Sequence, residues 1–157
     1  MADKGTANIS ASIFMDDIKS SLGGDLSYTP VSADDDAWVF AETGIAHDAD
    51  NILDTSDSYL GSSAAVSTSD KVKWLAIKNI STTATEGIGI NVSAGTANYN
   101  DTGTIILGNG EMLVINVPNC NVSDLHAKSC VLDSDGKPSS QGTSTVTCQV
   151  AAILENV

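Results

Sequence analysis

The second half of this chain is a succession of short segments in which apolar residues recur at every second position. Turns rich in Gly, Asn or Ser separate these segments, which cover residues 71–80, 87–92, 104–107, 111–117 and 144–154. In the second of them, the alternating aliphatic residues are Ile88, Ile90 and Val92. A period of two is typical of a half-buried β-strand. Strand after strand, with a turn about every ten residues, predicts an all-β sandwich or barrel.

The first half predicts further strands and little helix. Strands are expected at residues 8–15, 26–31 and 37–41, the first of which places Ile9, Ala11, Ile13 and Met15 on one face. Between the first two, Ile18 and Leu22 lie four residues apart and Gly23-Gly24 follows as a natural stop. That spacing predicts a short helical turn. The expected fold is therefore an antiparallel β-sandwich with at most one or two short helical turns.

Three of the predicted strands are apolar enough to be paired inside a sheet. Residues 71–80 and 111–117 carry apolar side chains on both faces, which is typical of strands covered on two sides. Residues 144–154 place Val146, Cys148 and Val150 on one face. We expect this last strand to be essential, so that a chain ending at Thr147 loses its cooperative fold.

The length and the pattern together predict one domain. At 157 residues, a chain buries roughly 68–70% of its unfolded surface, so its core needs no covalent staple. We expect a flexible N-terminal arm at residues 1–7 and a single sandwich domain at 8–157. Residues 42–69 are the least regular stretch and predict a long loop with one short strand at most. The arm and this loop are expected to contact neighbouring subunits.

The charge of the chain excludes two classes of partner. The formal net charge is −13, Lys and Arg together number seven, and all seven are Lys. Nucleic-acid backbones and anionic membranes both recruit basic residues, so neither is an expected partner. The acidity instead favours a soluble, self-repelling surface.

The N-terminus and the cysteines point to a cytosolic site of synthesis. Residues 1–5 lack the apolar stretch of a secretory signal, and no apolar run approaches the roughly 18 residues that span a bilayer. The three cysteines, Cys120, Cys130 and Cys148, have no metal-like spacing. We expect them to be reduced, with Cys148 as a small core residue.

No residue constellation predicts catalysis. Ser123, Asp124 and His126 are too close in the chain to adopt triad geometry together, and Ser123 is better explained as the N-cap of a short turn at 124–128. The other histidine, His47, has no catalytic pattern around it. We therefore predict no enzyme and no catalytic, cofactor or metal site.

Two binding alternatives remain open. Asp48, Asp50 and Asp54 lack EF-hand spacing, and residues 133–136 have its opening but no bidentate Glu at the right distance. A calcium site in these loops is possible, although turns built from Asp and Gly are the simpler interpretation. Surface tyrosines are the candidates for stacking a sugar: Tyr28, Tyr59 and Tyr99.

Residues 108–110 carry a strong turn signal. Gly108-Asn109-Gly110 lies between two apolar runs, and Asn-Gly supplies the positive φ angles of a two-residue turn. The sequence predicts a tight β-hairpin here, with a structural role.

Four features in order along residues 71–157 resemble small virion proteins of tailed bacteriophages. They are the run DKVKWLAIKN at 70–79, a Gly-bearing strand, IILGNGE at 105–111, and DLHA at 124–127 before a final apolar strand. The resemblance is to capsid decoration (cement) proteins of jelly-roll type. It implies a jelly-roll-like sandwich, often a homotrimer, on the exterior of the capsid, with the major capsid protein and copies of itself as partners.

The resemblance and the composition therefore lead to one expected function and one alternative. The expected function is a structural virion protein that decorates and stabilises a phage head, made in the host cytoplasm. The alternative is a tail-fibre or head-fibre module that binds a receptor or a glycan with the same sandwich.

Overall fold

The computed structural model describes residues 5–15, 18–29, 37–48, 52, 61–62, 66–93, 97–155 and 157. These residues form eleven β-strands and a 3-10 turn at Val122–Asp124. The strands are β1 (Gly5–Met15), β2 (Ile18–Tyr28), β3 (Ala37–Ile45), β4 (Gly61–Ser62), β5 (Lys71–Asn79), β6 (Glu86–Asn91), β7 (Ile105–Leu107), β8 (Met112–Asn121), β9 (His126–Leu132), β10 (Pro138–Gln141) and β11 (Val146–Glu155).

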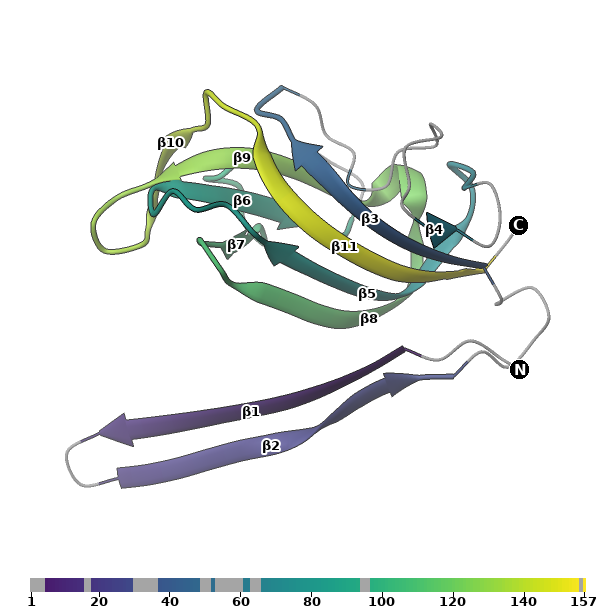
Figure 1. The fold of residues 1–157 in the computed structure, drawn as a ribbon, viewed down its shortest axis with the longest axis horizontal. Helices are drawn as coiled ribbons and strands as arrows, with labels where there is room; N and C mark the ends of the chain where they lie inside the picture. The colour runs from purple at the N-terminus through teal and green to yellow at the C-terminus, as the bar shows by residue number, and fades with distance from the viewer. Residues whose placement is uncertain are drawn as a thin grey trace.

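Nine of the strands build two antiparallel sheets that pack face to face (Figure 1). The five-stranded sheet has the order β4-β3-β11-β5-β8, and the four-stranded sheet has the order β10-β9-β6-β7. The two remaining strands, β1 and β2, form a separate hairpin. The prediction of an all-β, antiparallel sandwich is confirmed.

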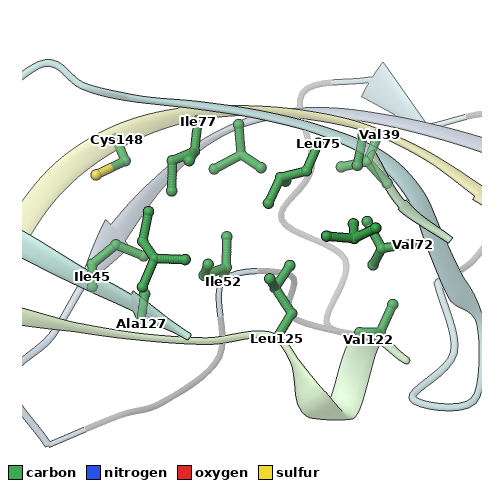
Figure 2. Close-up of a cluster of buried hydrophobic side chains, with 14 of the residues drawn as sticks. Val39, Ile45, Ile52, Val72, Leu75, Ile77, Val122, Leu125, Ala127 and Cys148 are labelled. Atoms are coloured by element: carbon green, nitrogen blue, oxygen red, sulfur yellow. The ribbon is translucent and has the colours of Figure 1, made fainter. Parts of the chain in front are cut away.

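The core lies between the two sheets. Figure 2 shows Leu75 and Ile77 of β5 on one side of this layer. Leu125, just before β9, and Ala127, within β9, face them from the other side. Ile52, from the stretch between β3 and β4, fills the same layer and is 1% exposed. The alternation read from the sequence thus identifies inward-facing residues of the strands that it predicted.

One buried polar side chain joins the sheets. Asn79, at the end of β5, is fully buried, and its Nδ2 donates to the carbonyls of Glu86 in β6 (3.0 Å) and Leu107 in β7 (3.4 Å). Its Oδ1 accepts from the backbone N–H of Ser81 at 2.9 Å. A residue of the five-stranded sheet therefore donates hydrogen bonds to backbone carbonyls of the four-stranded sheet. These bonds also satisfy the buried amide of Asn79 itself.

The C-terminal strand lies inside its sheet, as predicted. β11 pairs with β3 on one side and with β5 on the other, both antiparallel. Its residues Val146, Cys148 and Val150 are buried in the core. The predicted strands at 71–80, 87–92, 104–107, 111–117 and 37–41 correspond to β5, β6, β7, β8 and β3.

The predicted helical turn at 18–22 is wrong. Residues Ile18–Tyr28 form β2, which pairs along its whole length with β1. A spacing of four fits a strand as well as a helix, because four is also a multiple of two. The expected helix stop, Gly23-Gly24, instead pairs with Ser10 and Ile9 in the hairpin.

The turn at 108–110 forms, but it does not close a β-hairpin. β7 before it and β8 after it belong to different sheets, so the turn carries the chain across the sandwich. Glu111 N–H donates to the Gly108 carbonyl at 3.1 Å. Within this turn, only Gly110 has a positive φ, at 75°. The expected hairpin turn needs positive φ at both central residues, which Asn109 does not adopt.

The region after residue 122 also differs from expectation. Ser123 lies within the 3-10 turn, and the expected helical turn at 124–128 is replaced by the start of β9. Neither β9 nor β10 was expected. Their alternation is hard to detect because the buried residues of β9 include Ala127 and Ser129, which are small or polar.

The structure also places parts of the expected arm and loop. Gly5 to Ala7, within the expected arm, belong to β1. Of the expected 42–69 loop, β3 includes the residues up to Ile45, and Gly61–Ser62 form β4. Residues 49–51, 53–60 and 63–65 lie outside the described residues, as do 30–36, where the predicted 26–31 strand would end.

Candidate interaction surface

The outer face of the five-stranded sheet is unusually apolar for the outside of a sandwich. One row of cross-strand neighbours runs through Phe40, Ala151, Ala76 and Val114 on β3, β11, β5 and β8. In the next row, Ile153 pairs with Trp74. Outward-facing residues of a half-solvated antiparallel sheet are normally polar, so this apolar row is a candidate contact surface.

Part of this face is already packed. Trp74, Ala76 and Ile153 form a second buried cluster, separate from the sandwich core. Ala7 of β1 packs against this cluster together with Val114 and Ala151. The hairpin therefore contacts the outer face of the sheet at its base.

The rest of the face remains open. A depression of about 210 Å³ lies beside the cluster, where Ala76 and Ala151 leave space between larger side chains. Phe40 and Met112 line it and are 46% and 55% exposed. Two exposed large apolar side chains that line one hollow make this part of the face a candidate interaction site.

The indole of Trp74 adds an unused hydrogen-bond donor. Trp74 is 7% exposed, and its Nε1–H is buried without a hydrogen-bond acceptor. A buried indole N–H usually finds a partner. Its neighbours on the face, Ala76 and Ile153, have side chains with no acceptor to offer.

The hairpin is paired along its whole length. β1 and β2 run antiparallel from the Gly5–Tyr28 pair to the Met15–Ile18 pair. Near the open end, Ala7 lies opposite Leu26, and Asn8 Nδ2 donates to Asp25 Oδ1 at 2.7 Å. Because Ala7 packs on the sheet, the neighbouring Asn8–Asp25 pair lies on the other face of the hairpin.

The hairpin does not follow the sheet along its length. It runs on the β8 side of the sandwich and diverges from it toward the turn between β1 and β2 (Figure 1). Among the hairpin side chains that the structure describes, Ala7 is the one in the buried cluster.

The residues considered for catalysis lie in the 3-10 turn and at strand ends. Ser123 and Asp124 belong to the 3-10 turn, where Asp124 Oδ2 accepts from Asn121 Nδ2 at 3.0 Å. His126 begins β9. His47 follows β3, with its Nδ1 4.0 Å from the exposed carboxylate of Asp48.

The acidic residues considered for calcium form turns where the structure describes them. Asp133 Oδ1 accepts from the backbone N–H groups of Asp135 and Lys137, both at 2.9 Å. Asp50 and Asp54 lie outside the described residues. Within the described ranges, no group of three or more His, Cys, Asp or Glu residues is arranged to hold a metal ion.

The remaining residues considered in the sequence are the cysteines and the tyrosines. The three thiols are free and buried, and burial raises the pKa of Cys120 and Cys130 to about 11 and that of Cys148 to about 12. Such thiols remain protonated and unreactive near neutral pH. Tyr99 is half-buried, and Tyr59 lies outside the described residues, as does the side chain of Tyr28.

The open apolar face was not predicted, although the sequence contains its signal. The two-sided pattern of residues 71–80 and 111–117 was interpreted as complete burial. The structure instead places β8 at an edge, and its outward residue Met112 is exposed. A strand with two apolar faces at the edge of a sheet is the sequence signal of a candidate contact surface.

Comparison with protein-family models, curated protein sequences and solved structures finds no match to this chain. In the portion of the chain that the structure describes, no helix is long and apolar enough to cross a lipid bilayer.

Proposed function

We propose that this chain is a structural virion protein of a tailed bacteriophage, and that it decorates and stabilises the exterior of the head. The observation that carries the proposal is the combination of an apolar depression on the outer sheet face with a hairpin that packs beside it through Ala7. Both features serve contact between protein subunits. The jelly-roll type of sandwich and the trimeric assembly belong to the same proposal.

The character of the surface supports a capsid exterior. A net charge of −13 favours solubility and disfavours contact with packaged DNA. The apolar face supplies contact area without a charged partner, which suits a shell built from repeated copies.

Co-sedimentation with phage heads tests this function. Heads of the phage that encodes the chain are prepared without it, by deleting its gene, and are mixed with the purified protein. The proposal predicts saturable binding at a fixed number of copies per head and greater resistance of the heads to heat. A chain that binds host glycans on an array and leaves the heads unoccupied would contradict it and support the fibre alternative.

A further inference from the structure

The turn between β7 and β8 contains a chemically labile pair of residues. Asn is among the thermolabile residues of proteins, and Asn109 is the only Asn in the chain that Gly follows. Its side chain is exposed. We propose that Asn109 is a modification site that loses its side-chain amide when the turn opens, and that the product keeps the turn from closing again. In the closed turn, the fold protects the amide.

The reaction is an attack of the backbone on the preceding side chain. The Gly110 nitrogen gives its proton to solvent and bonds to Cγ of Asn109. The Cγ–Nδ2 bond breaks, and the leaving group takes up a proton and departs as ammonia. Water then opens the resulting succinimide ring at either carbonyl, which leaves Asp or iso-Asp at position 109. Gly favours the attack because it has no Cβ to hinder the approach of its nitrogen.

Two hydrogen bonds hold the reacting groups of the closed turn. The Gly110 N–H, which must lose its proton, donates to the Asn79 carbonyl at 3.0 Å. Asn109 Nδ2 donates to the Ser81 carbonyl, which ties the amide to the segment after β5. Breaking the first bond frees the nucleophile, and breaking the second lets the side chain turn toward it. The amide therefore persists while both bonds are intact.

Further hydrogen bonds brace the turn on both sides. Asn79 N–H donates to the Glu111 carbonyl at 3.0 Å, and Glu111 N–H donates to the Gly108 carbonyl at 3.1 Å. Glu111 Oε2 accepts from the Gly108 N–H at 2.6 Å. Because the turn is tied to Asn79, which is fully buried, we expect it to open only in rare local fluctuations.

The product of the reaction does not fit the closed turn. A carboxylate at position 109 has no N–H to donate, and its negative charge would face the Ser81 carbonyl oxygen, which is also an acceptor. Iso-Asp in addition lengthens the backbone by a methylene group between Gly108 and Glu111, which displaces the two partners of their hydrogen bond. The modification is thus a one-way record that the turn has opened.

Incubation at mildly alkaline pH, with and without denaturing guanidinium chloride, tests the protection. Peptide mapping by mass spectrometry measures the replacement of the Asn109 amide by a carboxyl group over time. The proposal predicts a loss at least about tenfold slower in the folded chain than in the denatured chain. Equal rates in the two states would overturn it.

Two variants of Glu111 test whether the brace of the turn sets the rate. Glu111→Ala removes the acceptor for the Gly108 N–H, whereas Glu111→Gln keeps an acceptor oxygen without the charge. In the folded state, Glu111→Ala should lose the amide at least about threefold faster than the wild type, and Glu111→Gln at nearly the wild-type rate. All three chains should react alike when denatured, and circular dichroism checks that each variant folds. Identical rates for the three folded chains would contradict the proposal.

Hydrogen exchange of the Gly110 N–H, followed by NMR, tests the one-way step. Asn109→Asp carries the product's charge, and Asn109→Ala lacks the donor but adds no charge. The proposal predicts faster exchange in Asn109→Asp than in Asn109→Ala. An Asp variant that exchanges no faster than the Ala variant would overturn this step. None of these measurements involves a phage head, so the proposal stands or fails independently of the capsid function.

Discussion

Asn79 is a buried polar residue that joins the two sheets by hydrogen bonds. Its side chain satisfies two backbone carbonyls of the four-stranded sheet and one N–H in the turn that follows β5. Substitution by Ala would leave these buried groups unpaired, and each such group costs about 1–3 kcal/mol.

We therefore expect Asn79→Ala to lower the free energy of unfolding by at least about 2 kcal/mol, measured by urea titration followed by circular dichroism. Asn109→Ala is the matched control, because its Nδ2 donates to the Ser81 carbonyl from an exposed position. The control should cost at most about 1 kcal/mol. Equal losses in the two variants would show that the buried network is not what joins the sheets.

The three buried thiols make stability depend on alkaline pH. Burial raises the pKa of Cys120, Cys130 and Cys148 to about 11, 11 and 12, above the ordinary value of 9.0, with the charge of Asp124 adding to the effect at Cys120. The unfolded chain therefore loses these protons first as the pH rises. The stability they contribute is complete below about pH 8.5 and is lost between about pH 9 and pH 12.

We expect the free energy of unfolding to fall across this alkaline range, and a Cys130→Ala/Cys148→Ala variant to show a shallower fall. A thiol reagent at pH 8 should label none of the three cysteines in the native protein and all three in guanidinium chloride. Rapid labelling of the native protein would contradict the burial of the thiols.

At the scale of elements, β11 is the strand that the five-stranded sheet cannot lose. It pairs with β3 and β5 at once, so its removal exposes two strand edges and takes the inward residues Val150, Ala152 and Leu154 out of the core. A chain that ends at Thr147 should show no cooperative thermal transition by circular dichroism. A cooperative melt of that truncated chain would contradict the central position of β11.

The sequence predicted elements well where alternation involved large apolar residues and poorly elsewhere. β5, β6 and β11 were predicted because Val, Ile and Leu recur at every second position. β2 was misread because the spacing of Ile18 and Leu22 satisfies both periods, and only pairing with β1 decides between them. β9 was missed because its buried Ser129 is polar and is satisfied by donating to the Ser144 carbonyl at 2.7 Å.

At the scale of the whole molecule, the interaction surface combines elements that are far apart in sequence. The sheet depression is the hollow on the outer face of the five-stranded sheet, and it draws on β3, β5, β8 and β11. Its lining residues are Phe40, Ala76, Lys78, Met112, Gln149, Val150 and Ala151. The hairpin that packs beside it comes from the N-terminal 28 residues. The sequence predicted the apolar residues of β5 and β8 but not which sheet face stays open, because that depends on strand order. Phe40 and Met112 line the same hollow only because the strand order is β3-β11-β5-β8.

Light scattering over a range of concentrations in moderate salt measures the mass of the full chain in solution. This measurement tests the proposed interaction surface most directly. The account predicts a stable oligomer, which a trimer would satisfy. It also predicts that Met112→Glu, which places a charge in the sheet depression, yields the monomer with its fold intact. Ser139→Glu adds the same charge to the other sheet and should leave the oligomer unchanged. A wild-type chain that remains monomeric at every concentration would contradict the account.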